Sequence, residues 1–357
     1  MKEIRIADRL VGGRHPTYFI ADISANHDGD LERAKALIHH CAEAGADAAK
    51  FQNFQAPKIV SDYGFRTLGG QLSHQSTWKR SVFEVYQAAS LPWEWTPVLK
   101  ETCRQAGIHY FSSPYDFDAV DMLDPYVPAH KIGSGDITWL DILRHIALKG
   151  KPVFLATGAS AIGDVQRAVH TLLEINPDLV LMQCNTNYTA NLENFRHIHL
   201  NVLRSYSVLF PEVVLGLSDH TPGHATVLGA VALGARVVEK HFTDDNSREG
   251  PDHPFSMTPA SWRDMVARTR ELEQALGSPD KDIAENERET AIVQRRCVRA
   301  ARDLAAGEVI RQADLAVLRP APAGSILPFE MDAAVGLKAA VDIPAGEALR
   351  WSFLVEP

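Results

Sequence analysis

The chain has 357 residues, of which 45% are hydrophobic and 23% are charged, and this composition is typical of a folded globular protein rather than a disordered or fibrous one. Its 36 basic and 45 acidic residues give a net charge of -9 without a basic tract, so a nucleic-acid partner is not expected. The four scattered cysteines suit reduced thiols and no apolar run reaches the roughly 20 residues of a membrane helix, which together favour a cytoplasmic protein without a membrane partner.

Short apolar runs rich in β-branched and aromatic residues recur along the first three quarters of the chain, and segments of helical periodicity separate them. The eight predicted strands begin near Tyr18, Ala48, Ile108, Ala129, Pro152, Leu179, Val213 and Ala235. The clearest predicted helices cover residues 31–46, 91–107 and 162–176. This alternation predicts an α/β fold built on a parallel sheet.

Eight nearly continuous apolar strands favour a closed TIM (β/α)8 barrel, because parallel strands are buried on both faces. An open doubly wound sheet is the alternative, but no G-x-G-x-x-G loop follows the first strand. Polar residues near the carboxyl ends of the predicted strands favour the barrel, since those ends meet on one face. They are Asp22, Lys50, Gln52, Ser112, Lys131, Ser134, Asn185, Ser218, His220 and His241.

The sequence pattern changes near residue 285, where a charged stretch gives way to short apolar pieces. Similar Ala-Gly-Glu turns occur at 305–308 and 343–347 and suggest two related halves. We predict a catalytic barrel over residues 1–280, a linker over 281–294 and a small β-rich domain over 295–357.

Lys50 and Lys131 lie at equivalent strand ends, with Ser134 close to the second lysine. A lysine there can simply be solvated, but two of them in a barrel would face the same mouth. Because an ammonium group is a compact charge suited to phosphate or carboxylate, the pair predicts a pocket for an anionic ligand.

His220 and His241 end consecutive predicted strands, which are neighbours in a barrel. Either histidine alone could be an ordinary core or surface residue. Together they could bind one divalent cation, and two imidazoles with oxygen ligands and open positions suit Mn²⁺ acting as a Lewis acid better than a closed zinc site.

Asp22 and Asp136 follow the first and fourth predicted strands and are the candidate acids or bases. Asp136 could instead cap a helix that begins at Ile137. The segment 26–35 has the pattern of a helix start, with Asp30 or Asp28 as its cap. Whether Asn26 and His27 have a functional or a structural role is ambiguous from this pattern.

Two further loops are candidates for ligand binding. The short loop 157–160 lies between a strand and a helix, where backbone N–H groups can meet an anion. The polar segment 244–257 follows the last strand and is either a lid or substrate-binding loop or a surface excursion.

The segments ADISANHDGD, AGADAAKFQNF, KIGSGDIT, KPVFLATGAS, GLSDHTPG and VVEKHFT, in this order, closely resemble the sialic acid synthase family, also called N-acetylneuraminate synthases. Residues 295–357 resemble the SAF, or antifreeze-like, domain that ends those enzymes. The resemblance implies a TIM-barrel transferase that condenses phosphoenolpyruvate with an N-acylated amino sugar, using Mn²⁺ or Mg²⁺ and releasing phosphate with C–O cleavage. It also implies a domain-swapped homodimer.

The resemblance also implies roles for individual residues. The matches to the phosphoenolpyruvate-binding positions are Lys50, Lys131, Ser134 and Ser218, and the matches to the metal ligands are His220 and His241. The matches near the acceptor sugar are Gln52, Tyr188, Asp252 and Arg319, the last of which would reach the active site of the partner subunit. Asp136 stands where the family has a glutamate proposed for proton transfer.

Three positions depart from the family pattern. Asp22 replaces a glutamate, and Ala156 replaces a hydroxyl residue, which leaves Thr157 and backbone amides for the phosphate. In CNTNYT either Asn185 or Asn187 could supply the expected amide. These changes suggest an acceptor other than N-acetylmannosamine, such as a 2,4-diacetamido-6-deoxy analogue.

Two alternative functions stay open. One is a metal-dependent pyruvate aldolase of the same barrel class. The other is a catalytically inactive protein of carbohydrate binding or polysaccharide assembly, against which Lys50, Lys131, His220 and His241 argue.

Overall fold

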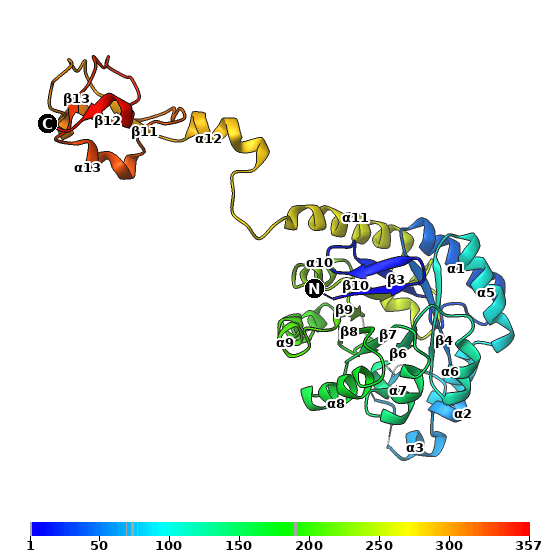
Figure 1. The fold of residues 1–357 in the computed structure, drawn as a ribbon. Helices are drawn as coiled ribbons and strands as arrows, with labels where there is room; N and C mark the ends of the chain where they lie inside the picture. Colours follow the sequence, from blue (N-terminus) through cyan, green and yellow to red (C-terminus); the bar gives the residue numbers. More distant parts are fainter. Residues whose placement is uncertain (1, 69, 73–74, 77, 189–190) are drawn as a thin grey trace. The chain divides into compact units, whose positions relative to one another are not determined.

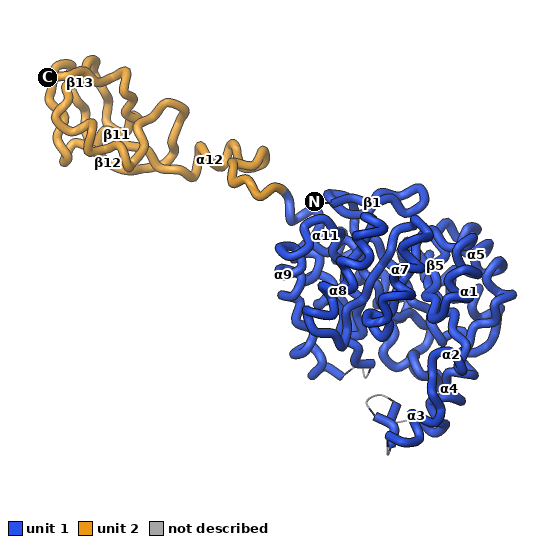
Figure 2. Tube along the Cα trace, turned by 60° about the horizontal axis from the view of Figure 1, so that its bottom comes forward, with its two compact units in different colours: residues 1–277 blue, residues 278–357 orange. Residues whose placement is uncertain are grey.

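The computed structural model describes residues 2–68, 70–72, 75–76, 78–188 and 191–357 and divides into two compact units (Figure 2). The first unit is Met1–Gly277 and the second is Ser278–Pro357. Each unit has a hydrophobic core of its own. Among the helices of the described residues, none combines the length and the apolar character that crossing a bilayer requires.

Eight parallel strands form the sheet of the first unit, and each lies in one of the eight apolar runs (Figure 1). They are β3 (Tyr18–Asp22), β4 (Ala48–Asn53), β5 (His109–Pro114), β6 (His130–Ile132), β7 (Val153–Ala156), β8 (Leu179–Cys184), β9 (Val214–Asp219) and β10 (Val237–His241). Their order is β5-β4-β3-β10-β9-β8-β7-β6, and β5 also contacts β6, which closes the ring. The predicted TIM barrel is confirmed, and the open sheet is wrong.

Helices surround this sheet (Figure 1). The α-helices are α1 (Leu31–Glu43), α2 (Ala56–Ile59), α3 (Asp62–Thr67), α4 (Val82–Ala89), α5 (Thr96–Gln105), α6 (Phe117–Leu123), α7 (Leu140–Ala147), α8 (Ile162–Leu173), α9 (Val202–Leu209), α10 (Ala225–Ala232) and α11 (Pro259–Leu276). The 3-10 turns are η2 (Trp93–Trp95), η3 (Ser134–Asp136), η4 (Leu192–His197) and η5 (His253–Phe255). The three predicted helices correspond to α1, to η2 with α5, and to α8.

Helix α1 begins where the sequence predicts. The Asp30 carboxylate accepts hydrogen bonds from the backbone N–H groups of Glu32 and Arg33, so Asp30 is the cap and Asp28 is not. Leu37, Ile38 and other apolar residues of one helical face are buried against the barrel.

A hairpin of β1 (Glu3–Ile6) and β2 (Arg9–Gly12) precedes the barrel and was not predicted from the sequence. Its Ile4, Ile6 and Val11 side chains pack with inward-facing barrel residues such as Phe111 and Phe154. The hairpin therefore contributes to the core inside the barrel, while the larger core lies between strands and helices.

The second unit contains both the segment predicted as a linker and the predicted small β-rich domain. Its elements are η6 (Glu285–Glu287), α12 (Arg288–Gln294), β11 (Cys297–Ala300), η7 (Gln312–Asp314), β12 (Leu315–Leu318), η8 (Pro328–Glu330), α13 (Met331–Ala334), β13 (Lys338–Ala339), η9 (Trp351–Phe353) and β14 (Leu354–Val355). Gly307 and Gly346 of the two Ala-Gly-Glu turns both have φ of 85°, which favours glycine. Leu304 and Ile343, which precede these turns, pair in an antiparallel bridge, so the two turns occupy equivalent places.

Candidate active site

Strand alternation decides which polar residues face the inside of the barrel. Tyr18 and Ile20 of β3 belong to the inner core, whereas Phe19 and Ala21 belong to the outer core. Successive side chains of a strand point to opposite faces, so the next inward residue of β3 is Asp22. The same alternation turns inward Lys50, Gln52, Lys131, Cys184, Ser218, His220, Glu239 and His241.

Asp22 lies between a lysine and a histidine in one row of the sheet. Strand pairing places His241 beside Asp22 and Asp22 beside Lys50. The Lys50 ammonium donates to Asp22 Oδ2 at 2.6 Å, and both residues are only 2% exposed. His241 Nε2 lies 3.6 Å from the same oxygen, and the Gln52 amide donates to it at 3.3 Å.

Glu239 is a site residue that the sequence interpretation missed. Its Oε1 lies 3.2 Å from the Lys131 ammonium and 3.8 Å from that of Lys50, and the Ser218 hydroxyl donates to it at 3.2 Å. The sequence could have indicated Glu239, because it lies two residues before His241 on the same strand and such residues share one face.

Lys50 forms ion pairs with two neighbouring carboxylates in the free protein. Burial opposes the charged form of Lys50, yet the carboxylates of Asp22 and Glu239 raise its pKa above the usual value. Asp22 Oδ1 and Glu239 Oε2 are buried and have no hydrogen-bond partner among the described residues. Buried polar atoms without partners are costly, and at this position they indicate a ligand-binding centre.

His220 and His241 meet as the sequence predicts, with ring centroids 5.3 Å apart. Burial lowers the pKa of both rings, that of His241 to about 3, so both are neutral at pH 7. His220 Nδ1 is 2.8 Å from the carbonyl oxygen of Asn185. A carbonyl only accepts, so Nδ1 carries the proton and Nε2 keeps its lone pair. Tyr188 and Phe255 pack against the two rings.

These residues fit a divalent cation. Two neutral imidazoles are competent ligands, and the buried Nδ1 of His241, like Asp22 Oδ1, has no partner among the described residues. No group of three or more His, Cys, Asp or Glu side chains that could hold a metal occurs in the part of the chain that the structure describes. The candidate protein ligands are the two neutral and adjacent rings of His220 and His241.

The loop after β7 approaches the site closely. The Gly158 N–H donates to Ser134 Oγ at 2.9 Å, and a Cβ on Gly158 would lie 2.5 Å from Thr186 Cγ2. Only glycine permits this approach. Cys184, which the sequence interpretation did not single out, lies close to Gly158. Burial raises the pKa of its thiol to about 11.

Thr157 is the first residue of this loop, but its hydroxyl points toward α9. It donates to the carbonyl oxygen of Met182 at 3.0 Å and accepts from the hydroxyl of Tyr206 on α9 at 3.0 Å. The inward position of β7 is occupied by Ala156, so the Thr157 side chain does not replace the hydroxyl absent there. A role for Thr157 toward phosphate stays a prediction.

The two asparagine candidates are engaged in different contacts. The Asn185 amide donates to the carbonyl oxygen of His197 at 3.1 Å, while Asn187 Oδ1 accepts from the Asn194 amide at 3.1 Å. Which of the two meets a substrate stays open. Thr189, at the end of the same motif, lies outside the described residues.

A cavity of about 410 Å³ opens beside the histidines. The predicted residues that line it are Gln52, Ser134, Asp136, Tyr188, His241 and Asp252. Its aromatic wall, which was not predicted, consists of Phe54, Trp78, Tyr86 and Tyr115. The fold therefore brings the predicted acceptor-sugar residues of the first unit to one place.

Asp136 lines the cavity and is partly buried. Burial raises its pKa to about 6, although Lys131 opposes the shift. It lies in η3, and α7 begins only at Leu140 with Trp139 as its cap residue. The alternative that Asp136 caps a helix beginning at Ile137 is wrong.

Arg319 belongs to the second unit, where it is exposed directly after β12. The barrel site described above is built from residues of the first unit alone. A contact of Arg319 with an acceptor sugar in a partner subunit stays a prediction.

Comparisons with known proteins agree with this architecture. A model of the NeuB family matches residues 37–281, and a SAF domain model matches residues 295–355. The N,N'-diacetyllegionaminic acid synthase of Legionella pneumophila is 33% identical over 96% of each chain. The human N-acetylneuraminate-9-phosphate synthase is 33% identical over 77% of this chain and 75% of its own. A crystal structure of sialic acid synthetase from Leptospira borgpetersenii superposes with a TM-score of 0.71, at 27% identity, over 81% of this chain and 95% of that one.

Proposed function

The chain belongs to the NeuB family, and from this membership we propose that it condenses phosphoenolpyruvate with the open-chain aldehyde of an N-acylated amino sugar, giving a nonulosonic acid and phosphate. One observation carries the proposal: two buried lysines and two neutral histidines meet at the mouth of one barrel. Such a site suits a phosphorylated anion beside an electrophilic carbonyl.

Lys50 and Lys131 would bind the carboxylate and phosphate of phosphoenolpyruvate. Their ammonium groups are held on inward strand positions by Asp22 and Glu239, so they need little reorganisation when the anion enters. The hydroxyls of Ser134 and Ser218 lie close enough to this centre to support the same ligand.

His220 and His241 would hold a divalent cation, Mn²⁺ or Mg²⁺. When bound there, such an ion supplies Lewis-acid polarisation of the acceptor aldehyde. The protein contributes neutral rings, through burial, and a defined tautomer of His220, through the Asn185 carbonyl.

Carbon–carbon bond formation would join C3 of phosphoenolpyruvate to the aldehyde carbon. Water then adds at C2, and phosphate leaves with cleavage of its C–O bond. The two substrates must lie together, which the adjoining lysine centre and cavity permit. Asp136, with a pKa of about 6, and Asp22 are the groups available to hold and move protons.

The acceptor would be an uncharged sugar. The cavity presents the carboxylates of Asp136 and Asp252, and none of its described lining residues is a lysine or arginine. A phosphate on the acceptor would need cationic partners there. The aromatic wall instead suits apolar groups, such as the methyl groups of acetamido substituents or a deoxygenated C6.

The homodimer expected from the resemblance belongs to this proposal. A cytoplasmic location is also part of the proposal. In the dimer, the partner's Arg319 would contact the N-acyl group of the sugar. An uncharged acyl group can accept from a guanidinium, so this contact is compatible with an uncharged acceptor.

The test is phosphate release from phosphoenolpyruvate with Mn²⁺ and a panel of acceptors. N-acetylmannosamine, its 2,4-diacetamido-6-deoxy analogue and N-acetylmannosamine bearing a 6-phosphate separate the acceptor classes. We expect turnover with an uncharged acceptor, at least about tenfold faster than with the phosphorylated one at equal subsaturating concentration.

Substrate labelling checks the bond that breaks. With ¹⁸O in the bridging position of phosphoenolpyruvate, the label should leave with phosphate, and its retention in the keto acid would overturn C–O cleavage. Turnover of pyruvate instead of phosphoenolpyruvate would establish the aldolase alternative, and no turnover with any acceptor would favour an inactive carbohydrate-binding protein.

A further inference from the structure

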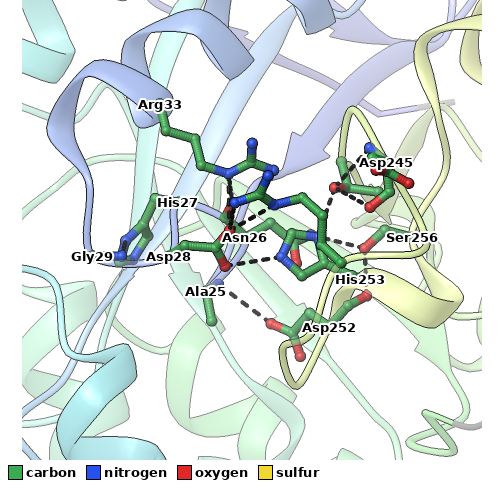
Figure 3. Close-up of polar contacts among 12 residues, drawn as sticks. Ala25, Asn26, His27, Asp28, Gly29, Arg33, Asp245, Asp252, His253 and Ser256 are labelled. Atoms are coloured by element: carbon green, nitrogen blue, oxygen red, sulfur yellow. Dashed lines mark hydrogen bonds and ion pairs between the residues drawn. The ribbon is translucent and has the colours of Figure 1, made fainter.

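The loops that follow β3 and β10 are joined by a dense polar network (Figure 3). β3 and β10 are adjacent parallel strands, so the residues after their carboxyl ends meet above the same part of the barrel. The turn 24–30 comes from the first loop and the segment 244–257 from the second. None of the proposed reaction steps uses the centre of this network.

Asp28 of the first loop bonds directly to residues of the second loop. Its Oδ1 accepts from His253 Nε2 at 2.9 Å (Figure 3). Its Oδ2 accepts from Arg248 Nε at 2.9 Å. Arg33 Nε lies 3.1 Å from the same Oδ2, and the Arg33 guanidinium also binds Asp244. Except for the local Arg33–Asp28 pair, these charge-assisted contacts link residues more than 200 positions apart in the sequence.

His253 is one of the fully buried residues of this network. Its side chain is fully buried, and its Nδ1 is 2.7 Å from the Thr243 hydroxyl. Both ring nitrogens therefore have partners, on Asp28 and Thr243. A Cβ on Gly250 would lie 2.6 Å from His253 Cδ2, so the segment also packs tightly against the ring.

The residue before His253 is Asp252, which lines the acceptor cavity. Asp252 Oδ2 accepts from the Ser24 hydroxyl at 2.6 Å and from the Ala25 N–H at 3.3 Å. The same oxygen lies 3.9 Å from His241 Nδ1. The position of this carboxylate thus depends on both loops at once.

The turn that meets Asp252 is held in an unfavourable backbone conformation. Ser24 and Asp28 have φ of 48° and 54°, values that residues other than glycine seldom adopt. Such conformations persist where surrounding contacts determine them, and they are common at functional sites. Here those contacts are the bonds of Ser24 to Asp252 and of Asp28 to His253.

We propose that Asp28 and His253 form a latch between the two loops and act as positioning residues that place the Asp252 carboxylate in the acceptor-sugar cavity. This inference rests on the proposed function. Asp252 lines the cavity, whereas among the described residues Asp28 and His253 form no hydrogen bond or ion pair with Lys50 or Lys131, so loss of the latch should weaken acceptor binding and leave phosphoenolpyruvate binding intact.

Kinetics of two latch variants test the proposal. Asp28→Asn keeps a residue that tolerates positive φ but removes the charge, and His253→Phe keeps a buried ring but removes both nitrogens. We expect the KM for the acceptor to rise about tenfold in each, with the KM for phosphoenolpyruvate within about twofold of wild type. The matched control is Glu249→Gln, which removes the exposed Glu249–Lys79 ion pair of the same segment and should change neither value.

A double-mutant cycle separates positioning from general stability. If the latch acts through Asp252, then Asp252→Asn alone raises the acceptor KM, and adding His253→Phe raises it little further. Fully additive effects, or equal increases of both KM values, would overturn the proposal. An unchanged acceptor KM in both latch variants would overturn it as well.

Limited proteolysis tests the latch without any assay of turnover. In His253→Phe, trypsin should cleave after Arg248 faster than in wild type. Lys79→Gln, which breaks the exposed Glu249–Lys79 ion pair without changing the bond after Arg248, should match wild type, with the cut identified by mass spectrometry. An unaltered cleavage rate would show that the latch does not hold the segment. If wild type turns over no acceptor, the proposed function fails while this measurement still decides whether the latch exists.

Discussion

At the scale of single residues, burial and the partner of each buried group determine which side chains of the site are charged. Lys50 stays charged because Asp22 and Glu239 raise its pKa against the effect of burial. His220 and His241 have no such carboxylate in hydrogen-bond contact, so burial keeps their rings neutral. One barrel mouth therefore holds charged ammonium groups and neutral imidazoles together.

Removal of either histidine should abolish turnover without unfolding the protein. His220→Ala and His241→Ala each lose a candidate metal ligand, and we expect phosphate release to fall at least about 100-fold and Mn²⁺ binding to weaken. Circular dichroism and calorimetric titration with Mn²⁺ provide the measurements. His224→Ala, which removes a partly exposed histidine paired with Asp264, is the control. Full metal-dependent activity in either site variant would contradict the ligand assignment.

Asp136 should impose a pH dependence on both activity and stability. Its pKa is raised to about 6 by burial, so a kcat/KM profile should bend near pH 6, and Asp136→Asn should remove that bend. A raised carboxyl pKa means that the folded state holds the proton more tightly than the unfolded state. Stability is therefore lost as pH rises from about 4 to about 6. At pH 8 Asp136→Asn should melt a few degrees above wild type, and at pH 4 the two should coincide.

At the scale of elements, outward residues of β9 and β10 hold the strands that carry the histidines. Asp219 and Lys240 are register partners, immediately precede His220 and His241, and are almost fully buried. The Lys240 ammonium binds Asp219 Oδ2, and Thr226 of α10 donates to the same oxygen at 2.7 Å. Burial opposes the charged form of Asp219, but Lys240 lowers its pKa below the usual value.

Removing one partner of this buried ion pair should destabilise the protein more than replacing both partners. Lys240→Met leaves the Asp219 carboxylate buried without its counter-charge, and we expect a loss of about 3 to 5 kcal/mol in the free energy of unfolding. Asp219→Asn combined with Lys240→Met should recover part of that loss. Urea unfolding of wild type and the two variants measures the loss, and a double variant no more stable than Lys240→Met would argue against the explanation.

At the scale of the whole molecule, two units with separate cores are joined by an exposed segment. Residues 278–290 are exposed throughout, and they contain Lys281 and Arg288. Each unit buries its own apolar residues, so neither core depends on the other unit.

Cleavage of the connecting segment should leave a folded barrel that binds phosphoenolpyruvate but does not convert the acceptor. We expect trypsin to cut first at Lys281 or Arg288, because exposed connections are preferred sites of proteolysis. Residues 1–277 expressed alone should bind phosphoenolpyruvate with an affinity within about threefold of the full chain. Turnover should be lost, since Arg319 is absent. Unchanged acceptor turnover would contradict the proposed role of the second unit.

Local signals in the sequence determined the eight strands and the inward direction of Asp22, Lys50, Lys131, His220 and His241, and they limited the cap of α1 to Asp30 or Asp28. Strand alternation and helix capping depend on residues a few positions apart, so a single sequence contains them. The same alternation would have identified Glu239 and the outward direction of Thr157, although neither was inferred. These were omissions of interpretation rather than limits of the sequence.

Only the tertiary structure decided which distant segments meet. The aromatic wall of the cavity, the insertion of the β1–β2 hairpin into the barrel core and the contact of Asp28 with His253 could not be derived from local patterns. The physical reason is that strand order, register and barrel closure place loops hundreds of residues apart side by side. Their contacts depend on the closed ring as a whole, while a strand or a cap depends on a few neighbouring residues.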